Sequence, residues 1–299
     1  MAGLTRPSRR AWWISLFILG VSIFLFDSCM QFRMSKAEVE NYFREEPVKG
    51  LREEYVVGRQ RIVYVRAGER TKPLVVFVHG SPGSLSAFIH FLKDSSLLQH
   101  AQLLTIDRPG FGDASFGKAE PSLKKQAEVL MPAIRQNASG QPVILVGHSL
   151  GGPVIARMAM DYPDEIDGLV FVAASNNPDL EPNERWFRGP LHSPLFRWLI
   201  PRSFRASNDE ILNLQDQLDA MLPLWKELRM PASVIQGADD KLVHPANAAF
   251  TKRQMVNAKV AVTFEDDMSH FIPWSNPETI RHAILNLLPE SIDYHRSKR

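Results

Sequence analysis

The sequence has one cysteine among its 299 residues, so no disulfide can form within the chain. It also has no large excess of positive or negative charge. Its 35 lysines and arginines and 33 aspartates and glutamates give a formal net charge of +2. Without a basic field, the charge balance does not favour nucleic acid as a partner. No internal repeat or low-complexity tract is present. The hydrophobic share of 44% is enough for one sizeable core.

One long apolar run is present, at residues 11–26 (AWWISLFILGVSIFLF), and Arg6, Arg9 and Arg10 precede it. This order is typical of a signal peptide or a short signal anchor. The arginines favour an amino terminus in the cytoplasm and an extracytoplasmic domain on the periplasmic side. Cys29 ends the sequence FDSC, which resembles a weak bacterial lipoprotein cleavage box. Lipidation at Cys29, a retained membrane anchor and a soluble secreted form all stay open.

Short apolar runs alternate with helical patterns along the rest of the chain, which is typical of parallel βα units. The runs are continuously hydrophobic, which indicates strands covered on both faces. We therefore predict an α/β fold with a mostly parallel sheet and helices on both faces. The predicted strands are 61–66, 74–78, 103–106, 143–146, 169–173, 233–235 and 260–264, and the clearest predicted helices are 123–135, 152–162 and 277–288.

Residues 176–230 interrupt this alternation, because they contain prolines and aromatic residues but no strand pattern. We interpret them as a helical cap over the carboxyl edge of the sheet, with an ordinary long crossover as the alternative. The expected domains are a signal peptide or anchor at 1–28, a linker at 29–50, a catalytic core at 51–175 and 231–290, the cap at 176–230 and a basic tail at 291–299.

The most specific motif is GHSLG at residues 147–151, which follows a predicted strand directly and precedes a predicted helix. In this context G-x-S-x-G forms a strained turn that lifts the serine hydroxyl above the sheet, and the glycines allow close backbone packing. The helix amino end adds positive potential where an oxyanion would form. The motif therefore predicts Ser149 as a nucleophile.

A serine nucleophile needs a base, and in this arrangement the acid and the histidine follow the serine along the chain. His270 fits best because it comes soon after the last predicted strand. Asp240 is the favoured acid, which would hold the imidazole tautomer. Asp239 and Asp179 are the alternatives. We expect His79 and His148, which lie within the motifs, to pack or hydrogen-bond locally.

A tetrahedral intermediate needs two backbone N–H donors. The residue after the nucleophile, Leu150, supplies one. The other is expected from the loop HGSPGS at residues 79–84, where Ser81 is the natural donor and Pro82 stiffens the turn.

Together HGSPGS, DRPGFGDAS, GHSLGG, GADDKLVHP and the His270 segment resemble the α/β-hydrolase superfamily over residues 52–290. The H-G-x-P loop is similar to that of epoxide hydrolases and haloalkane dehalogenases, but Ser149 stands where those enzymes use aspartate. Ser269 replaces a glycine often found before the base. The resemblance implies a helical cap and no cofactor, and the sequence offers no metal site.

We therefore expect a serine hydrolase that cleaves a small to medium ester, thioester or lactone through an acyl-enzyme. Aromatic residues in the cap and Trp274 favour an apolar acyl group. The alternatives are an aminopeptidase or amidase, acyl transfer, cofactor-free haloperoxidase-like chemistry, and a non-catalytic binding protein of the same fold. The expected partners are a small-molecule acyl substrate and, through the amino-terminal segment, a membrane.

Overall fold

A computed structural model describes residues 9–45 and 47–299, which form one eight-stranded sheet in the order β1-β2-β4-β3-β5-β6-β7-β8. Strand β2 runs antiparallel to both of its neighbours, whereas β4, β3 and β5 to β8 pair in parallel. The predicted mostly parallel sheet is confirmed. The strands are β1 Leu51–Val57, β2 Gln60–Ala67, β3 Leu74–Val78, β4 Gln102–Ile106, β5 Val143–His148, β6 Gly168–Val172, β7 Ala232–Gly237 and β8 Val260–Glu265.

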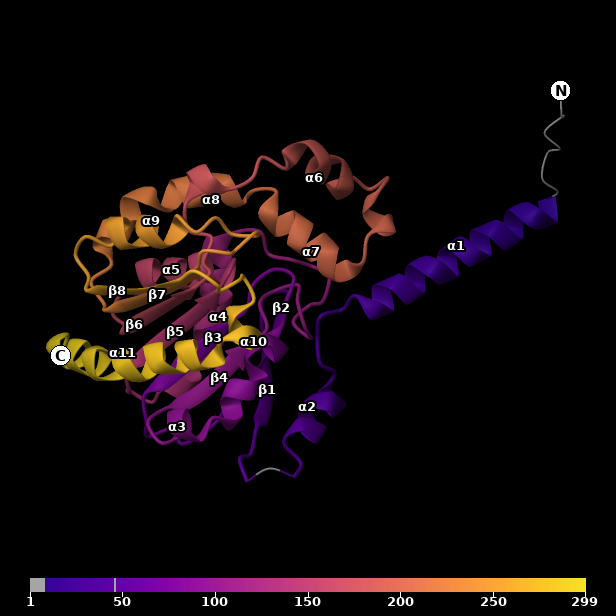
Figure 1. Cartoon of the computed structure of the whole chain (residues 1–299). Coiled ribbons are helices and arrows are strands. Elements are labelled where there is room, and N and C mark those ends of the chain that lie inside the picture. The colour runs from indigo at the N-terminus through magenta and orange to yellow at the C-terminus, as the bar shows by residue number, and fades with distance from the viewer. Residues whose placement is uncertain (1–8, 46) are drawn as a thin grey trace.

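Helices cover both faces of this sheet (Figure 1). The α-helices are α1 Arg9–Cys29, α2 Lys36–Tyr42, α3 Ser95–Leu98, α4 Leu123–Ala138, α5 Gly151–Asp161, α6 Arg185–His192, α7 Arg202–Ile211, α8 Leu214–Met221, α9 Asn247–Gln254, α10 Ile272–Ser275 and α11 Pro277–Ser297. Four 3₁₀ helices among the described residues are η1 Leu85–Lys93, η2 Pro178–Leu180, η3 Arg197–Leu199 and η4 Leu222–Glu227.

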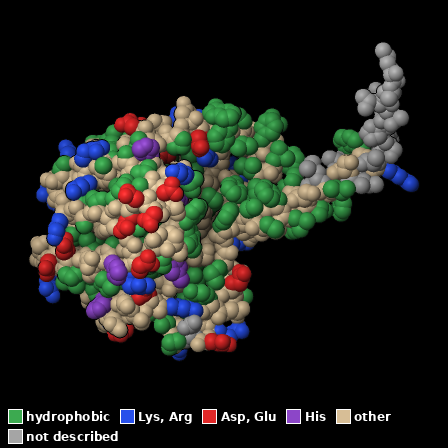
Figure 2. Space-filling view, viewed as in Figure 1, with side chains coloured by type: hydrophobic (Ala, Val, Ile, Leu, Met, Phe, Trp, Pro, Cys, Tyr) green, Lys and Arg blue, Asp and Glu red, His purple; other side chains and the backbone are tan. Residues whose placement is uncertain are grey.

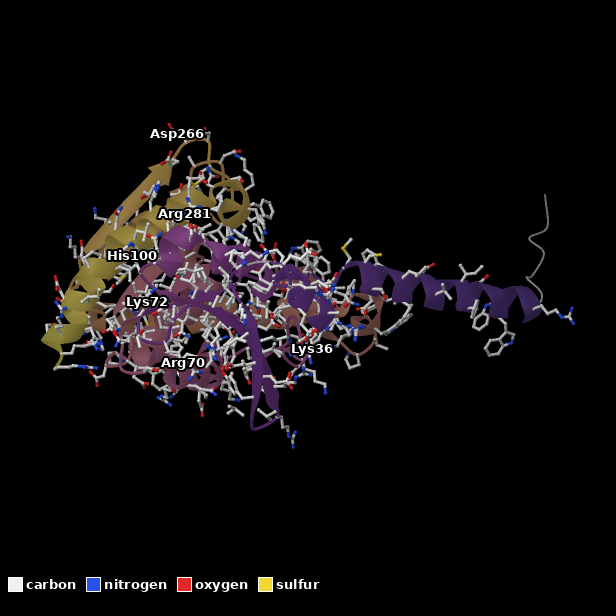
Figure 3. All side chains as sticks on the ribbon, turned by 90° about the horizontal axis from the view of Figure 1, so that it is seen from below. Lys36, Arg70, Lys72, His100, Asp266 and Arg281 are labelled. Atoms are coloured by element: carbon white, nitrogen blue, oxygen red, sulfur yellow. The ribbon has the colours of Figure 1, made fainter. Side chains whose placement is uncertain are left out.

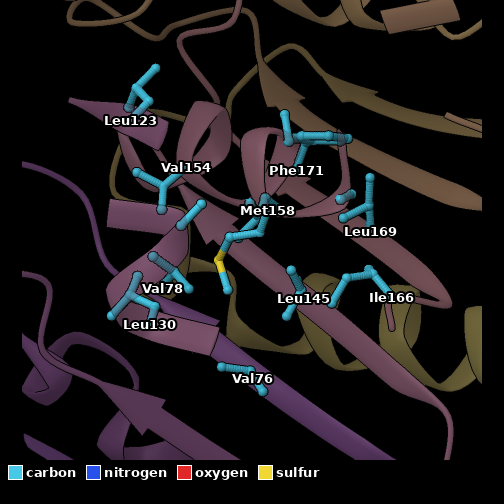
Figure 4. Close-up of a cluster of buried hydrophobic side chains, with 14 of the residues drawn as sticks. Val76, Val78, Leu123, Leu130, Leu145, Val154, Met158, Ile166, Leu169 and Phe171 are labelled. Atoms are coloured by element: carbon cyan, nitrogen blue, oxygen red, sulfur yellow. The ribbon is translucent and has the colours of Figure 1, made fainter. Parts of the chain in front are cut away.

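The strand side chains divide the core into two layers, because successive residues of a strand point to opposite faces. In β3, Val76 and Val78 pack with the helices α4 and α5, as the close-up in Figure 4 shows. Phe77, between them, packs instead with η1 and α11. Both faces of the central strands are therefore buried, which explains why their sequences are apolar throughout.

The cap lies between β6 and β7, where the described residues form helices η2, α6, η3, α7, α8 and η4 and no strand. Helices α6 and α7 extend over one end of the sheet (Figure 1). Only part of this segment belongs to the core, mainly through α8 and the fully buried Trp225 of η4. The predicted helical cap is confirmed.

Helix α1 contains the long apolar run and projects away from the rest of the molecule in two perpendicular views (Figures 1 and 3). Many of its described side chains are exposed, among them Trp13 at 70% and Phe17 at 72%. None of the helices in the described part of the chain has the length and apolar character needed to cross a membrane. Arg6, which precedes the run, lies outside the described residues.

The sequence prediction missed β1 because its Leu51–Val57 stretch carries charges. Glu53 is stabilised in the sheet by its neighbour β2, since its carboxylate accepts hydrogen bonds from Arg66 and from the hydroxyl of Tyr64. The prediction of a separate basic tail at 291–299 was wrong for most of that segment. Helix α11 continues to Ser297, and this end is held by contacts of His295 and Lys298 with Asp167.

Candidate active site

Ser149 lies on a tight turn between β5 and α5 with a backbone φ of 53°, a left-handed conformation that is rare for residues other than glycine. Its N–H donates to the carbonyl of Val172 at 2.9 Å, which fixes the turn to β6. A Cβ atom at Gly147 would overlap the carbonyl of Gly151, and one at Gly151 would overlap the carbonyl of Val78. The two glycines of the motif are therefore required by close backbone contacts.

His270 follows β8, and its Nδ1 lies 2.8 Å from Oδ2 of Asp240, which follows β7. The other oxygen of Asp240 accepts the backbone N–H groups of Leu242 and Val243 at 2.9 and 2.8 Å. Burial by itself would raise the pKa of Asp240, but the hydrogen bonds from His270 and these amides outweigh it and lower the pKa. An ionised Asp240 keeps the Nδ1–H tautomer of His270, which leaves Nε2 with a free lone pair.

The two alternative acids lie elsewhere. Asp239 pairs with Lys241 at 2.7 Å, and its side chain is 59% exposed. Asp179 is an exposed residue of η2. Of the three candidates, the structure brings only Asp240 into contact with the imidazole.

Ser149 and His270 line two adjoining cavities together. The cap cavity, of about 610 Å³, extends beneath α6 and α7 and is lined by apolar cap residues that include Leu191 and Ile211. The Trp274 cavity, of about 480 Å³, is bordered by Trp274. Ser81 lines both cavities and Leu150 lines the cap cavity. The structure thus brings together the five residues that the sequence singles out.

Arg108, in the loop after β4, organises the segment before Ser81. It is fully buried, and its guanidinium donates to the carbonyls of His79 and Gly80 at 2.8 and 2.9 Å. The Gly80 carbonyl also lies 2.7 Å from Nδ1 of His79. The Gly80 carbonyl and the Ser81 N–H belong to one planar peptide bond, in which the two groups point in opposite directions. Because Arg108 holds the Gly80 oxygen, it also fixes the direction of the Ser81 N–H.

The same guanidinium binds Glu210 of α7 and the side chain of Gln126. Burial raises the pKa of Glu210, and the charge of Arg108 opposes that shift. Sequence reasoning missed this network. Arg108 lies in the motif DRPGFGDAS, but its partner Glu210 is 102 positions further along the chain, and no spacing rule connects them.

The two motif histidines hydrogen-bond locally, as expected. Nε2 of His79 accepts the backbone N–H of Arg108 at 3.0 Å. Nε2 of His148 lies 2.9 Å from the carbonyl oxygen of His270 and donates to it, which holds the backbone of the predicted base. Burial, together with the nearby His270, lowers the pKa of His148 to about 3. His148 is therefore neutral at physiological pH.

No cluster of three or more histidine, cysteine, aspartate or glutamate side chains suited to a metal ion occurs within the described ranges. The polar groups near Ser149 are a carboxylate, an imidazole and the backbone amides at the start of α5.

Comparison with known proteins supports the fold assignment. A family model described as the alpha/beta hydrolase fold matches residues 73–198. The chain therefore has the α/β-hydrolase fold. A crystal structure of a putative lipase from Acinetobacter baumannii AYE superimposes on this chain with a TM-score of 0.65, at 20% identity, covering 86% of this chain and 97% of that one.

Two curated relatives match a shorter stretch of this chain. The sn-1-specific diacylglycerol lipase ABHD11 of Mus musculus is 31% identical over 110 residues, which are 36% of this chain and 34% of that protein. Epoxide hydrolase 4 of Mus musculus is 27% identical over 113 residues, 38% of this chain and 31% of that protein. The chain thus spans about a third of the length of these relatives.

Proposed function

We propose that this α/β hydrolase is a serine hydrolase that cleaves carboxylic esters, thioesters or lactones through an acyl-enzyme. The observation that carries the proposal is the buried pair of His270 and Asp240 at cavities that Ser149 also lines. An aspartate nucleophile, as in epoxide hydrolases, has no counterpart at residue 149. Ser149 on its strained turn is the nucleophile of this proposal.

In the proposed reaction, Nε2 of His270 takes the proton of the Ser149 hydroxyl while Oγ bonds to the substrate carbonyl carbon. The N–H groups of Ser81 and Leu150 stabilise the oxyanion. His270 then gives its proton to the leaving oxygen or sulfur as the bond to the carbonyl carbon breaks. A water molecule, deprotonated by His270, attacks the acyl-enzyme, and the acid leaves as the proton returns to Ser149.

The two cavities support an apolar substrate. The cap cavity is lined largely by aliphatic and aromatic side chains, and the Trp274 cavity contains Ala87, Phe271 and Trp274. Because the cavities meet at Ser149, one can hold the acyl group and the other the leaving group. The name of the relative ABHD11, a diacylglycerol lipase, fits this preference for an acyl ester.

A fluorophosphonate probe tests the proposal, because it labels only activated serines. We expect the full-length protein to be labelled and Ser149→Ala to be unlabelled and inactive on nitrophenyl esters. Ser175→Ala is the matched control, since Ser175 lines the same cap cavity but its hydroxyl binds Glu181. A folded wild-type protein that takes up no label, or a Ser149→Ala variant that keeps its ester hydrolysis, contradicts the proposal.

We also propose that the amino-terminal segment holds the catalytic domain at a membrane. The exposed apolar side chains of helix α1 support this location. Retention of the segment is favoured over cleavage and lipidation at Cys29. Asp27, which cleavage before Cys29 would remove, forms an ion pair with Arg202 of the cap at 2.8 Å.

Mass spectrometry of the protein from a membrane fraction of its natural host tests this second proposal. We expect an uncleaved amino-terminal segment and an unmodified Cys29. A mature chain that begins with a lipidated Cys29 supports the membrane but contradicts retention. Recovery of the protein in the soluble fraction contradicts both.

A further inference from the structure

The end of α1 and the segment that follows it pack against the cap helix α7. The carboxylate of Asp27 accepts the backbone N–H of Arg202 at 2.6 Å and its Nε at 2.9 Å. Two residues beyond Arg202, the ring of Phe204 meets Phe32 edge to face, with centroids 5.6 Å apart. The amino-terminal segment is therefore tied to the cap at two places.

The same aromatic residues border the two cavities that meet at Ser149. Phe26 lines the cap cavity, Phe32 lines the Trp274 cavity, and Phe204 lines both. All three rings are partly open to solvent, with exposed fractions of 48%, 46% and 37%. Both cavities thus reach the surface beside the point where α1 leaves the body of the protein.

Apolar side chains are exposed on both sides of this point. Figure 2 shows hydrophobic groups gathered along α1 and over the neighbouring cap. We call this set the docking surface. Its members are Trp12, Trp13, Phe17, Ile18, Val21, Phe24, Leu25 and Phe26 on the amino-terminal helix, and Trp186, Leu195, Phe196, Trp198 and Leu199 on the cap.

The chemistry of this surface favours lipid as its partner. The exposed apolar residues of α1 occupy all sides of the helix, as in helices that are surrounded by apolar material. Tryptophans, which favour the boundary between lipid and water, lie on both α1 and the cap. An apolar surface of this extent is costly to leave in water.

We propose that the docking surface enters a lipid bilayer and that the active site draws its substrate, an acyl ester of a membrane lipid, from that bilayer along the aromatic rim of Phe26, Phe32 and Phe204. This inference rests on the proposed serine hydrolase and names its substrate class. A lipid ester can then reach Ser149 through the cavities without crossing water.

The test compares one ester in vesicles with one in solution, using the full chain. The vesicles consist of ether-linked phosphatidylcholine, which an esterase cannot cleave, and carry monooleoylglycerol. The soluble ester is nitrophenyl butyrate. The docking variant replaces Trp12, Trp13 and Phe17 by serine. The matched control replaces Val256 and Phe264 by serine, since these are also exposed but Phe264 lies on β8, at the opposite edge of the sheet from β1.

We expect the docking variant to lose about tenfold or more of its vesicle binding and of its oleate release, because binding scales with inserted apolar area. Its rate on nitrophenyl butyrate and both rates of the control stay at the wild-type level. Asp27→Ala, which removes one of the two ties between the amino-terminal segment and the cap, should keep vesicle binding but slow oleate release. That result would distinguish delivery of the lipid ester to the active site from attachment of the protein to the vesicle.

Three outcomes overturn the inference. The docking variant releases oleate from vesicles at the wild-type rate, the wild-type protein does not bind vesicles, or the docking substitutions turn a dimer into a monomer without changing vesicle binding. The last outcome assigns the surface to a second copy of the chain. Failure of the proposed hydrolase is distinct, since the wild-type protein would then cleave neither ester while vesicle binding still reports on docking.

Discussion

The guanidinium of Arg108 binds the carboxylate of Glu210 through both terminal nitrogens, at 2.6 and 3.2 Å, and neither side chain is open to solvent. Arg108 lies in the loop after β4, and Glu210 lies on the cap helix α7. Because Arg108 also holds the carbonyls of His79 and Gly80, one side chain connects the cap with the segment that ends at Ser81.

Glu210→Gln should destabilise the protein strongly. The substitution keeps the shape of the side chain but leaves the charge of Arg108 buried without a counter-charge, which costs about 3 kcal/mol. Urea unfolding measures the loss. The control is Glu165→Gln, which breaks an ion pair of the same type with Arg135 at the surface, where both side chains are at least 36% exposed. That change should cost less than about 1 kcal/mol. Equal losses in the two variants would show that burial of the Glu210 pair has no energetic consequence.

Arg108→Lys should lower turnover more than substrate binding. Lysine keeps the charge near Glu210 but cannot hold both carbonyls of the His79–Gly80 segment with a planar fork. The Ser81 N–H then loses its fixed direction, and we expect kcat to fall by about a hundredfold, as when an oxyanion donor is lost. KM on a soluble ester should change little. A variant whose unfolding free energy falls while kcat stays unchanged assigns Arg108 a purely structural role.

Asp240→Asn should abolish most activity while its neighbour tolerates the same change. The amide of asparagine can donate to Nδ1 and stabilise the wrong tautomer of His270, which in a triad costs about 10⁴ in kcat. Asp239→Asn removes only an exposed ion pair with Lys241 and should keep kcat within about twofold. Steady-state kinetics on one soluble ester decide between them. Comparable losses in both variants contradict the assignment of Asp240 as the residue that orients the base.

The positions of Ser149, His270 and Asp240 could be predicted because the proposed chemistry requires fixed residue types after particular strands. The glycines around Ser149 carry the same information, since their lack of a side chain follows from the close backbone contacts of the turn. These are local rules, and a single sequence expresses them.

Other parts of the molecule follow no such rule. Strand β1 can hold the charged Glu53 because Arg66 of the neighbouring strand β2 pairs with it. The sequence of β1 alone does not reveal this partner. The pair of Arg108 and Glu210 joins residues far apart in the chain, so only the folded structure brings them together. Both the charged strand β1 and the Arg108–Glu210 pair depend on contacts between segments that are distant in the sequence. Hydrophobic periodicity does not encode such contacts.

His148 should make the protein less stable as the pH falls. Its pKa is near 6.5 when it is exposed in the unfolded chain, but burial and the nearby His270 lower it to about 3 in the folded protein. Between these values the unfolded chain binds a proton that the folded protein does not, so acid favours unfolding. The contribution reaches about 1.4 kcal/mol for each pH unit below the unfolded pKa.

The variant His148→Gln isolates this contribution, because glutamine can still donate to the carbonyl of His270 but does not titrate. Other titrating groups, including the buried His79, are shared by the two proteins and cancel in the comparison. Between about pH 6 and pH 4.5, the wild-type protein should lose about 2 kcal/mol more unfolding free energy than the variant. Urea unfolding at several pH values measures this difference, and parallel pH profiles would show that His148 is not held neutral in the fold.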